Sequence, residues 1–238
     1  MRCQVYTVKI PPNITENDIK KLLPYVSPQR AEKIKRLAVL NDKALSLYAE
    51  LLLRHIIADK LKISGSQINF GASQYGKPYL VGINKYKFNI SHSLDYVACA
   101  VADCEVGVDI QRLQKADILT AKHIFSAEEY GRFLKLPQSR RDKEFFKLWT
   151  IKESYLKAIG TGFFTEPKSF SAIKNFMGKY KLISQNNAVF FFKTYNIDNS
   201  YMLSVCSVKN SFCNKPAKVD FNEVTELFAK ILSPPPFI

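Results

Sequence analysis

The sequence contains no apolar stretch that approaches the roughly 20 residues a helix needs to cross a bilayer. Residues 1–13 alternate apolar and polar side chains, so they do not form the continuous apolar run of a signal peptide. These two absences lead us to expect a cytoplasmic protein that does not enter a membrane. A hydrophobic content of 47% in 238 residues is still ample for a buried core, which excludes a disordered chain.

Cysteine is also scarce. The five cysteines are Cys3, Cys99, Cys104, Cys206 and Cys213, and no two of them form a C-x-x-C pair. An odd number of cysteines does not fit a closed disulfide framework, and no Cys/His spacing matches a zinc site. Cys99 and Cys104 lie in strand-like runs, where packing in the core is the better interpretation.

Acidic residues are outnumbered by Lys and Arg, 21 against 35, which gives a formal net charge of +14. Such a charge attracts polyanions: nucleic acid, phosphorylated ligands or an acidic protein. The basic residues are scattered, without a Lys/Arg tract or an RNA-binding aromatic motif. We therefore do not expect nucleic acid as the partner.

The hydrophobic pattern of the first half predicts a strand, two helices and several short strands. A strand is expected over residues 3–9, and Ser27 followed by Pro28 predicts the start of a helix that continues to about Leu37. A second helix is expected over about 42–60, where apolar residues recur at helical spacing. The remaining strands are predicted at 68–70, 79–81, 87–90 and 96–102.

The second half repeats this order. A strand over 105–111 precedes a helix that opens at Ser126, which has capping-box spacing to Glu129. A long helix is predicted over about 141–159, ending at Gly160 and Gly162. The strands of this half are expected at 168–173, 180–184, 188–195 and 201–208.

The repeated order predicts an α+β fold, a pseudo-dimer of two similar α/β halves, each with helices packed on a small, mainly antiparallel sheet. The boundary is expected near Asp103, which gives halves 1–103 and 104–238, with a ligand cleft between them. No strong residue-level repeat supports the duplication, so it depends on element order alone. The proline-rich tail 233–238 is expected to be loose.

Two segments with acidic side chains stand out. In the strand over 105–111, Asp109 and Gln111 share one face. A carboxylate at a strand end could bind a hard cation or could simply face solvent, and the sequence favours neither. On the long helix, Glu153 and Lys157 are spaced i, i+4, which is also typical of a plain surface ion pair. Lys152 projects from the apolar face of this helix, so it is either buried with a partner or reaches into a site.

Two further segments are polar. In Phe88-Asn-Ile-Ser-His-Ser93, polar residues crowd the end of a short strand, and His92 taken alone favours a structural role. Tyr75-Gly-Lys-Pro78 is a turn that presents Lys77, and surface turns of this kind are common. Each segment alone therefore carries little weight.

Together, the four segments GKP, FNISHS, GVD and WTIKE resemble, in their order and separations, the motifs of the Sfp-type 4'-phosphopantetheinyl transferases. The resemblance covers nearly the whole chain. The resemblance implies a pseudo-dimeric fold. It also implies an enzyme that uses Mg²⁺ to move 4'-phosphopantetheine from coenzyme A onto a serine of an acyl or peptidyl carrier protein, releasing 3',5'-ADP.

The resemblance also implies roles for single residues. Asp109 and Glu153 would be magnesium ligands, Lys157 the catalytic lysine, and Glu153 would take the serine proton directly or through water. Where the family commonly has a third acidic residue, this chain has Gln111, whose carbonyl oxygen could reach the ion directly or through water. Residues that would hold the phosphates or the nucleotide end of coenzyme A are Lys77, Ser91, His92, Arg30, Lys33 and Ser46.

Arg30 and Lys33 lie one helical turn apart, so both could reach one 3'-phosphate, although solubilising surface charge is the alternative. The charge of +14 suits an acidic carrier, from fatty acid, polyketide or peptide synthesis, and residues 112–125 are expected to form part of its docking surface. A monomer is expected. The rival functions are a non-catalytic binder of coenzyme A or carrier proteins and a nucleic-acid-binding module, which would show steep salt dependence but leave the ordered motifs unexplained.

Overall fold

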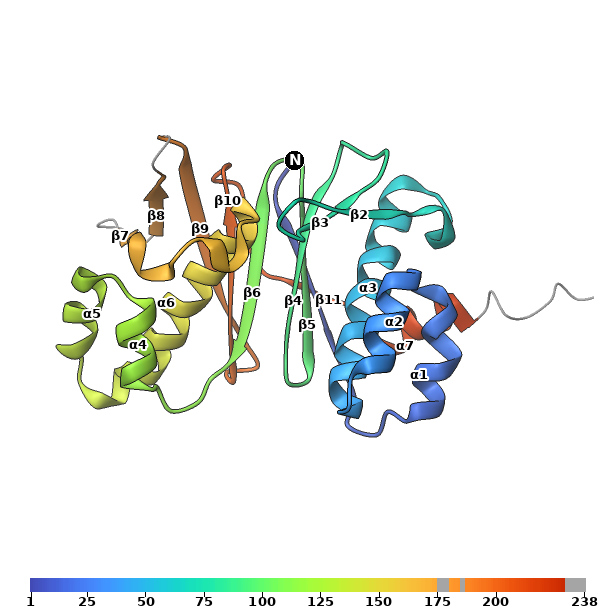
Figure 1. The fold of residues 1–238 in the computed structure, drawn as a ribbon, viewed down its shortest axis with the longest axis horizontal. Coiled ribbons are helices and arrows are strands. Elements are labelled where there is room, and N and C mark those ends of the chain that lie inside the picture. Colours follow the sequence, from blue (N-terminus) through green and yellow to red (C-terminus); the bar gives the residue numbers. More distant parts are fainter. Residues whose placement is uncertain (175–179, 185–186, 230–238) are drawn as a thin grey trace, which may run out of the picture.

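The computed structural model describes residues 1–174, 180–184 and 187–229. Two sheets meet in the middle of the molecule, and most helices lie on the two outer sides (Figure 1). The predicted α+β architecture of two similar halves is thereby confirmed. The tail 233–238 lies outside the described residues. No described helix has both the length and the apolar character required to cross a membrane.

The sheet of the first half has four strands in the order β11-β1-β5-β4, of which β11 (Ala217–Lys218) comes from the C-terminal segment, and β2 and β3 form a separate hairpin. The Ser27 side chain accepts a hydrogen bond from the Arg30 amide and caps α2, as predicted. The elements of this half are β1 (Gln4–Lys9), α1 (Glu16–Leu22), α2 (Pro28–Arg36), α3 (Leu40–Leu61), β2 (Phe70–Ala72), β3 (Pro78–Leu80), β4 (Lys87–Ser93) and β5 (Tyr96–Ala102).

The second half contains a five-stranded antiparallel sheet in the order β6-β10-β9-β8-β7. The predicted capping box of Ser126 and Glu129 is present at the start of α5, and Gly160 ends α6 in the left-handed conformation. The elements of this half are β6 (Val106–Arg112), α4 (Ile118–Ile124), α5 (Ala127–Leu134), α6 (Gln138–Ile159), β7 (Ile173–Lys174), β8 (Tyr180–Ile183), β9 (Val189–Ile197) and β10 (Tyr201–Ser207).

The predicted strand over 168–173 is wrong for most of its length. The chain instead forms a 3-10 turn at Pro167–Ser169, and a strand begins only at β7. The buried ammonium group of Lys152 explains this shape, because it binds the backbone carbonyls of Pro167 and Phe170 at 2.9 and 2.6 Å. Lys152 also pairs with Glu129 at 2.7 Å, so of its two predicted environments it has the buried one, with a partner.

Arg54 plays a corresponding part in the first half. It is buried, pairs with Glu50 at 2.7 Å, and donates to the carbonyls of Gly65 and Ile68 after the end of α3. In both halves, therefore, a buried cation of the long helix pairs with a carboxylate and holds the segment that follows the helix. This residue-level similarity between the halves was not predicted from the sequence.

The two halves also meet through a reciprocal contact. The Tyr96 hydroxyl donates to Asp198 of the second half, and the Tyr201 hydroxyl donates to Asp95 of the first. The two tyrosine rings pack edge to face with their centroids 4.9 Å apart. Each half thus supplies one tyrosine and one aspartate to the same junction.

The C-terminal segment returns to the first half. β11 (Ala217–Lys218) pairs with β1 in parallel, and α7 (Phe221–Ala229) packs on α3, where Phe221 stacks on Tyr48 with ring centroids 4.7 Å apart. The division between residues 103 and 104 stays a prediction, but β11 and α7 pack on elements of the first half, while Lys218 also pairs with Asp198 of the second half at 3.2 Å. α1, α4, α7 and β11 were not predicted.

Candidate active site

Helix α6 crosses β6 at a very short distance, because Gly107 has no side chain. A Cβ atom at Gly107 would lie 2.0 Å from the Ser154 carbonyl oxygen and 2.4 Å from the Ala158 nitrogen. The glycine of the Gly-Val-Asp segment is therefore required by packing. It allows the helix that carries Lys157 to approach the strand that carries Asp109.

Asp109 is 1% exposed, and three predicted site residues surround its carboxylate. The Lys157 ammonium donates to Oδ1 at 2.6 Å, and the Ser91 hydroxyl donates to the same oxygen at 2.8 Å. Lys157 also donates to Ser91 Oγ at 2.9 Å, and the Gln111 amide donates to Asp109 Oδ2 at 3.2 Å. Residues from β4, β6 and α6 therefore form one cluster at the junction of the halves.

Glu153 lies beside this cluster and is half-buried. Burial raises the pKa of its carboxyl group, the charge of Asp109 raises it further, and Lys157 partly opposes both effects. Within the described residues, no three side chains of His, Cys, Asp or Glu come together in a way that could hold a metal ion. The candidate ligands are therefore two neighbouring carboxylates and the amide of Gln111, and their roles stay predictions.

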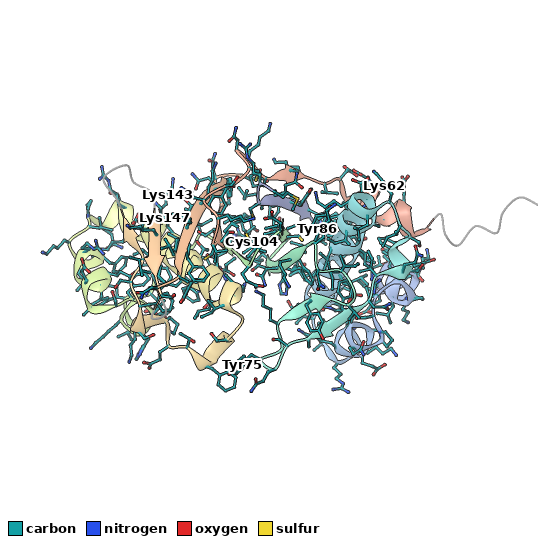
Figure 2. The ribbon with its side chains drawn as sticks, turned by 90° about the horizontal axis from the view of Figure 1, so that it is seen from above. Lys62, Tyr75, Tyr86, Cys104, Lys143 and Lys147 are labelled. Carbon is teal, nitrogen blue, oxygen red and sulfur yellow. The ribbon has the colours of Figure 1, made fainter. Side chains whose placement is uncertain are left out.

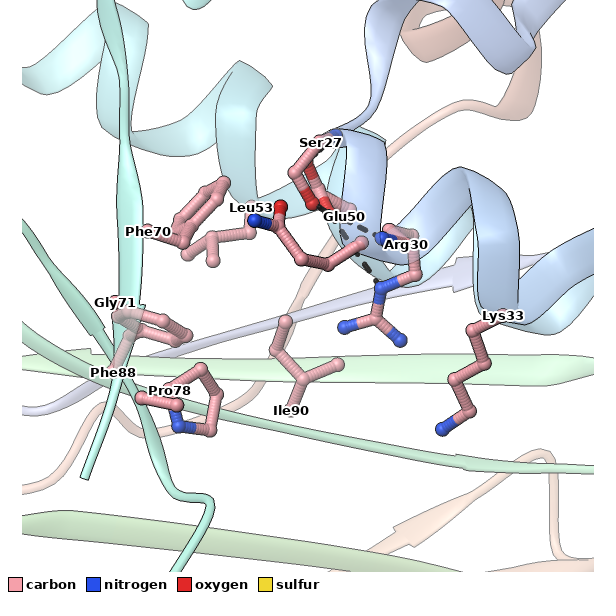
Figure 3. Close-up of a pocket in the computed structure, with 12 residues that line it drawn as sticks. Ser27, Arg30, Lys33, Glu50, Leu53, Phe70, Gly71, Pro78, Phe88 and Ile90 are labelled. Atoms are coloured by element: carbon pink, nitrogen blue, oxygen red, sulfur yellow. Dashed lines mark hydrogen bonds and ion pairs between the residues drawn. The ribbon is translucent and has the colours of Figure 1, made fainter. Parts of the chain in front are cut away.

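A cavity of about 380 Å³ lies between α2, the β2–β3 hairpin and β4. Figure 3 shows Arg30 and Lys33 extending from α2 at one side of it. The opposite side is apolar and includes Phe70, Pro78 and Phe88. The cavity thus combines two cations with a surface suited to a flat ring.

Arg30 is held in place by two buried residues of α3. Ser46 Oγ accepts a hydrogen bond from its guanidinium at 3.4 Å. The Glu50 carboxylate lies 3.5 Å from its Nε atom (Figure 3). The Glu50 carboxylate also accepts a hydrogen bond from the Ser27 amide at 2.6 Å. We did not predict Glu50, although a carboxylate within the apolar run of α3 was a usable signal, because an acid rarely lies there without a partner.

His92 follows Ser91 on β4 and is exposed. Its pKa is lowered, first because protein atoms desolvate the ring and then because Lys157, Lys33 and Arg30 place positive charge near it. Cations from both halves therefore act electrostatically on the same histidine. Such a region would stabilise a ligand with several negative charges.

Lys77 lies apart from the 380 Å³ cavity. Its ammonium donates to the Ala158 carbonyl at 2.5 Å, near the end of α6, and pairs with Glu105 at 2.8 Å. Tyr75, in the same turn, contacts Phe164 of the second half with ring centroids 5.2 Å apart, and Figure 2 shows Tyr75 between the two halves. The predicted contact of Lys77 with a phosphate stays a prediction.

Comparisons with known proteins agree with this arrangement. The profile of the 4'-phosphopantetheinyl transferase superfamily matches residues 105–206, and the profile described as 4'-phosphopantetheinyl transferase, N-terminal, matches residues 13–104. The 4'-phosphopantetheinyl transferase psf-1 of Bacillus pumilus is 32% identical over 93% of this chain and 94% of its own length. The transferase gsp of Aneurinibacillus migulanus is 34% identical over 93% of each chain, and Sfp of Bacillus subtilis is 27% identical over 93% of this chain and 99% of its own.

Proposed function

Because the chain belongs to the 4'-phosphopantetheinyl transferase superfamily, we propose that it transfers the 4'-phosphopantetheine group of coenzyme A to a serine of an acyl or peptidyl carrier protein and releases 3',5'-ADP. The observation that carries the proposal is the cluster of Asp109, Lys157 and Ser91 beside Glu153. It brings together the carboxylates of Asp109 and Glu153, which could bind a metal ion or accept a proton, and the ammonium group of Lys157.

The nucleotide end of coenzyme A would occupy the cavity beside α2. Arg30 and Lys33 would bind the 3'-phosphate, with Arg30 already oriented by Ser46 and Glu50. The pyrophosphate would then lie toward His92 and Ser91, where cations of both halves converge. Lys77 would have to leave Glu105 in order to reach it.

We propose Mg²⁺ as the metal, held by Asp109 and Glu153 with Gln111 as a direct or water-mediated third ligand. Carboxylate and amide oxygens are the hard donors that this ion prefers, and the raised pKa of Glu153 beside Asp109 fits two acids that share a cation. A rotation of the Gln111 amide would present its oxygen, since the nitrogen now faces Asp109. The bound ion would supply positive charge to the reacting pyrophosphate.

In the proposed reaction, the carrier serine oxygen forms a bond to the phosphorus joined to pantetheine, and the bond from that phosphorus to the bridging oxygen breaks. 3',5'-ADP leaves with the bridging oxygen. Glu153 takes the serine proton directly or through water, and the route through water is favoured because a carboxylate that binds Mg²⁺ is a weak base. Lys157 stabilises or protonates the leaving oxygen, because its ammonium already lies at the cluster.

The carrier would dock on residues 112–125, which include α4. Leu119 is 70% exposed there, and Lys115 and Lys122 are exposed beside it, a mixture suited to an acidic partner with an apolar contact point. We further propose a cytoplasmic monomer, in which the second half takes the place of a partner subunit.

The test is incubation with coenzyme A, Mg²⁺ and apo carriers of the fatty acid, polyketide and peptide classes, followed by the mass of each carrier. A carrier should gain one phosphopantetheine group, and Glu153→Gln should reduce the rate at least about 100-fold, because it removes both a ligand and a base. Glu128→Gln, an exposed substitution on α5, is the matched control. Coenzyme A binding without a mass gain on any carrier would instead support the non-catalytic binder.

A further inference from the structure

The two halves are joined by a row of hydrogen bonds from backbone amides to side chains. Three side-chain oxygens of β4 accept from three amides of β6: Asn89 from Val108 at 2.9 Å, Ser91 from Ile110 at 3.4 Å and Ser93 from Arg112 at 3.1 Å. Each acceptor precedes its donor by 19 residues, so all three contacts keep one register. We call these three contacts the β4–β6 seam.

The seam follows from the periodicity of the two strands. Alternate residues of β4 place their side chains on one face, and alternate residues of β6 direct their amides away from β10. β6 is the end strand of its sheet, so these amides have no strand partner on that side. Buried amides without partners are costly, and the Asn-x-Ser-x-Ser pattern of β4 satisfies them.

Two hydrogen bonds of the seam lie on either side of Asp109, the candidate metal ligand, along β6. Asp109 lies between Val108 and Ile110, the two β6 residues whose amides the buried end of the seam binds. Ser91 of the seam donates directly to Asp109 Oδ1. A slip of one repeat along the strand would move Asp109 by roughly 7 Å and bring Gly107 or Gln111 opposite Ser91. The register of the seam therefore determines whether Asp109 meets Ser91, which also accepts a hydrogen bond from Lys157.

We propose that Asn89 is a positioning residue for the transfer reaction, because its hydrogen bond to the Val108 amide fixes the β4–β6 register that places Asp109 against Ser91. This inference rests on the proposed function. Asn89 is 6% exposed, and its side chain makes the shortest bond of the seam. Its side-chain oxygen binds the backbone of β6, so its effect would pass through β6 and not through the substrate.

The structure offers a matched pair of substitutions at this position. Serine already accepts from β6 at Ser91 and Ser93, so Asn89→Ser retains an acceptor, whereas Asn89→Ala differs from it by a single oxygen. Asn89→Ala should have a kcat about tenfold below that of Asn89→Ser, with KM for coenzyme A within about twofold. Its Val108 amide should exchange with solvent about tenfold faster. Ser93→Ala, at the exposed end of the seam, should change kcat less than about twofold.

A purely structural asparagine would lower thermal stability without separating the serine and alanine variants in kcat. Equal kcat values for the two variants, or failure of both to fold, would therefore overturn the proposal. If only Asn89→Ala does not fold, Asn89→Cys, whose sulfur is a weak acceptor, takes its place. A wild-type protein that modifies no carrier refutes the proposed function instead. Exchange of the Val108 amide then still decides whether Asn89 fixes the β6 register.

Discussion

The ammonium group of Lys77 lies 2.8 Å from the carboxylate of Glu105, and this ion pair joins a turn of the first half to the residue before β6 of the second. Lys77 also donates to the Ala158 carbonyl near the end of α6. Its side chain is mostly buried, whereas Glu105 is 49% exposed. The lysine is therefore engaged by the protein itself at a place where we expect it to serve a phosphate.

If coenzyme A must take Lys77 from Glu105, then Glu105→Gln should tighten coenzyme A binding. The expected gain is about threefold, because an exposed ion pair is worth little. Glu166→Gln changes the net charge equally, at the exposed pair of Glu166 with Lys168, and should leave the affinity unchanged. Titration calorimetry measures both. Weaker binding by Glu105→Gln, or an equal gain in the control, would contradict the exchange of partners.

The two cations of α2 should distinguish coenzyme A from its 3'-dephospho form. Replacing both Arg30 and Lys33 by alanine should reduce the ratio of the two affinities about tenfold or more, because charge-assisted hydrogen bonds to the 3'-phosphate are lost. Replacing Lys35 and Arg36 removes the same charge from exposed positions of the same helix. An unchanged ratio in the first double variant would show that Arg30 and Lys33 are only surface charge.

His92 should link coenzyme A binding to pH. Its pKa in the free protein is lowered from 6.5 by desolvation and by nearby cations, and a bound polyanion would raise that pKa. Binding should therefore take up protons, and the affinity should rise as the pH falls from neutral toward the lowered pKa of His92 in the free protein. Calorimetry in two buffers of different ionisation enthalpy measures the uptake, and His92→Gln should abolish it. Equal uptake in that variant would assign the protons to another group.

The same shift has the opposite sign for folding. A histidine whose folded pKa is lowered binds more protons in the unfolded chain, so its contribution makes the free energy of unfolding fall as the pH drops below 6.5. His92→Gln should reduce this loss. Low pH should thus favour ligand binding while it weakens the free protein.

Gln111 is the position where the chain departs from its family, and its amide nitrogen lies 3.2 Å from Asp109 Oδ2. Gln111→Glu should raise the apparent Mg²⁺ affinity, because a carboxylate binds this ion more strongly than an amide. Turnover at saturating Mg²⁺ should change much less and could fall, since added negative charge opposes an anionic substrate. Gln114→Glu, exposed and three residues along the chain, is the control. Superimposable curves of rate against Mg²⁺ for wild type and Gln111→Glu would remove residue 111 from the metal site.

The sequence by itself determined the features that depend on neighbours along the chain. Ser27 and Ser126 were recognisable as helix caps, because a cap bonds an amide three residues later. Gly160 marked the end of α6, and an uninterrupted apolar run marked β5 to the residue. The order of the four motifs predicted the family, since it needs only residue types and separations.

Only the tertiary structure decided which distant groups meet. Three contacts show this: Lys152 pairs with Glu129 of another helix, Lys77 binds the end of α6, and α7 packs on α3. Each joins segments that are separated in the sequence or belong to different halves. The β4–β6 seam is the clearest case. Its Asn-x-Ser-x-Ser pattern was visible in the sequence. Only the packing of the two sheets, however, places the end strand β6 opposite those side chains. Hydrogen bonds and ion pairs act over a few ångströms, so their partners depend on packing and not on local pattern.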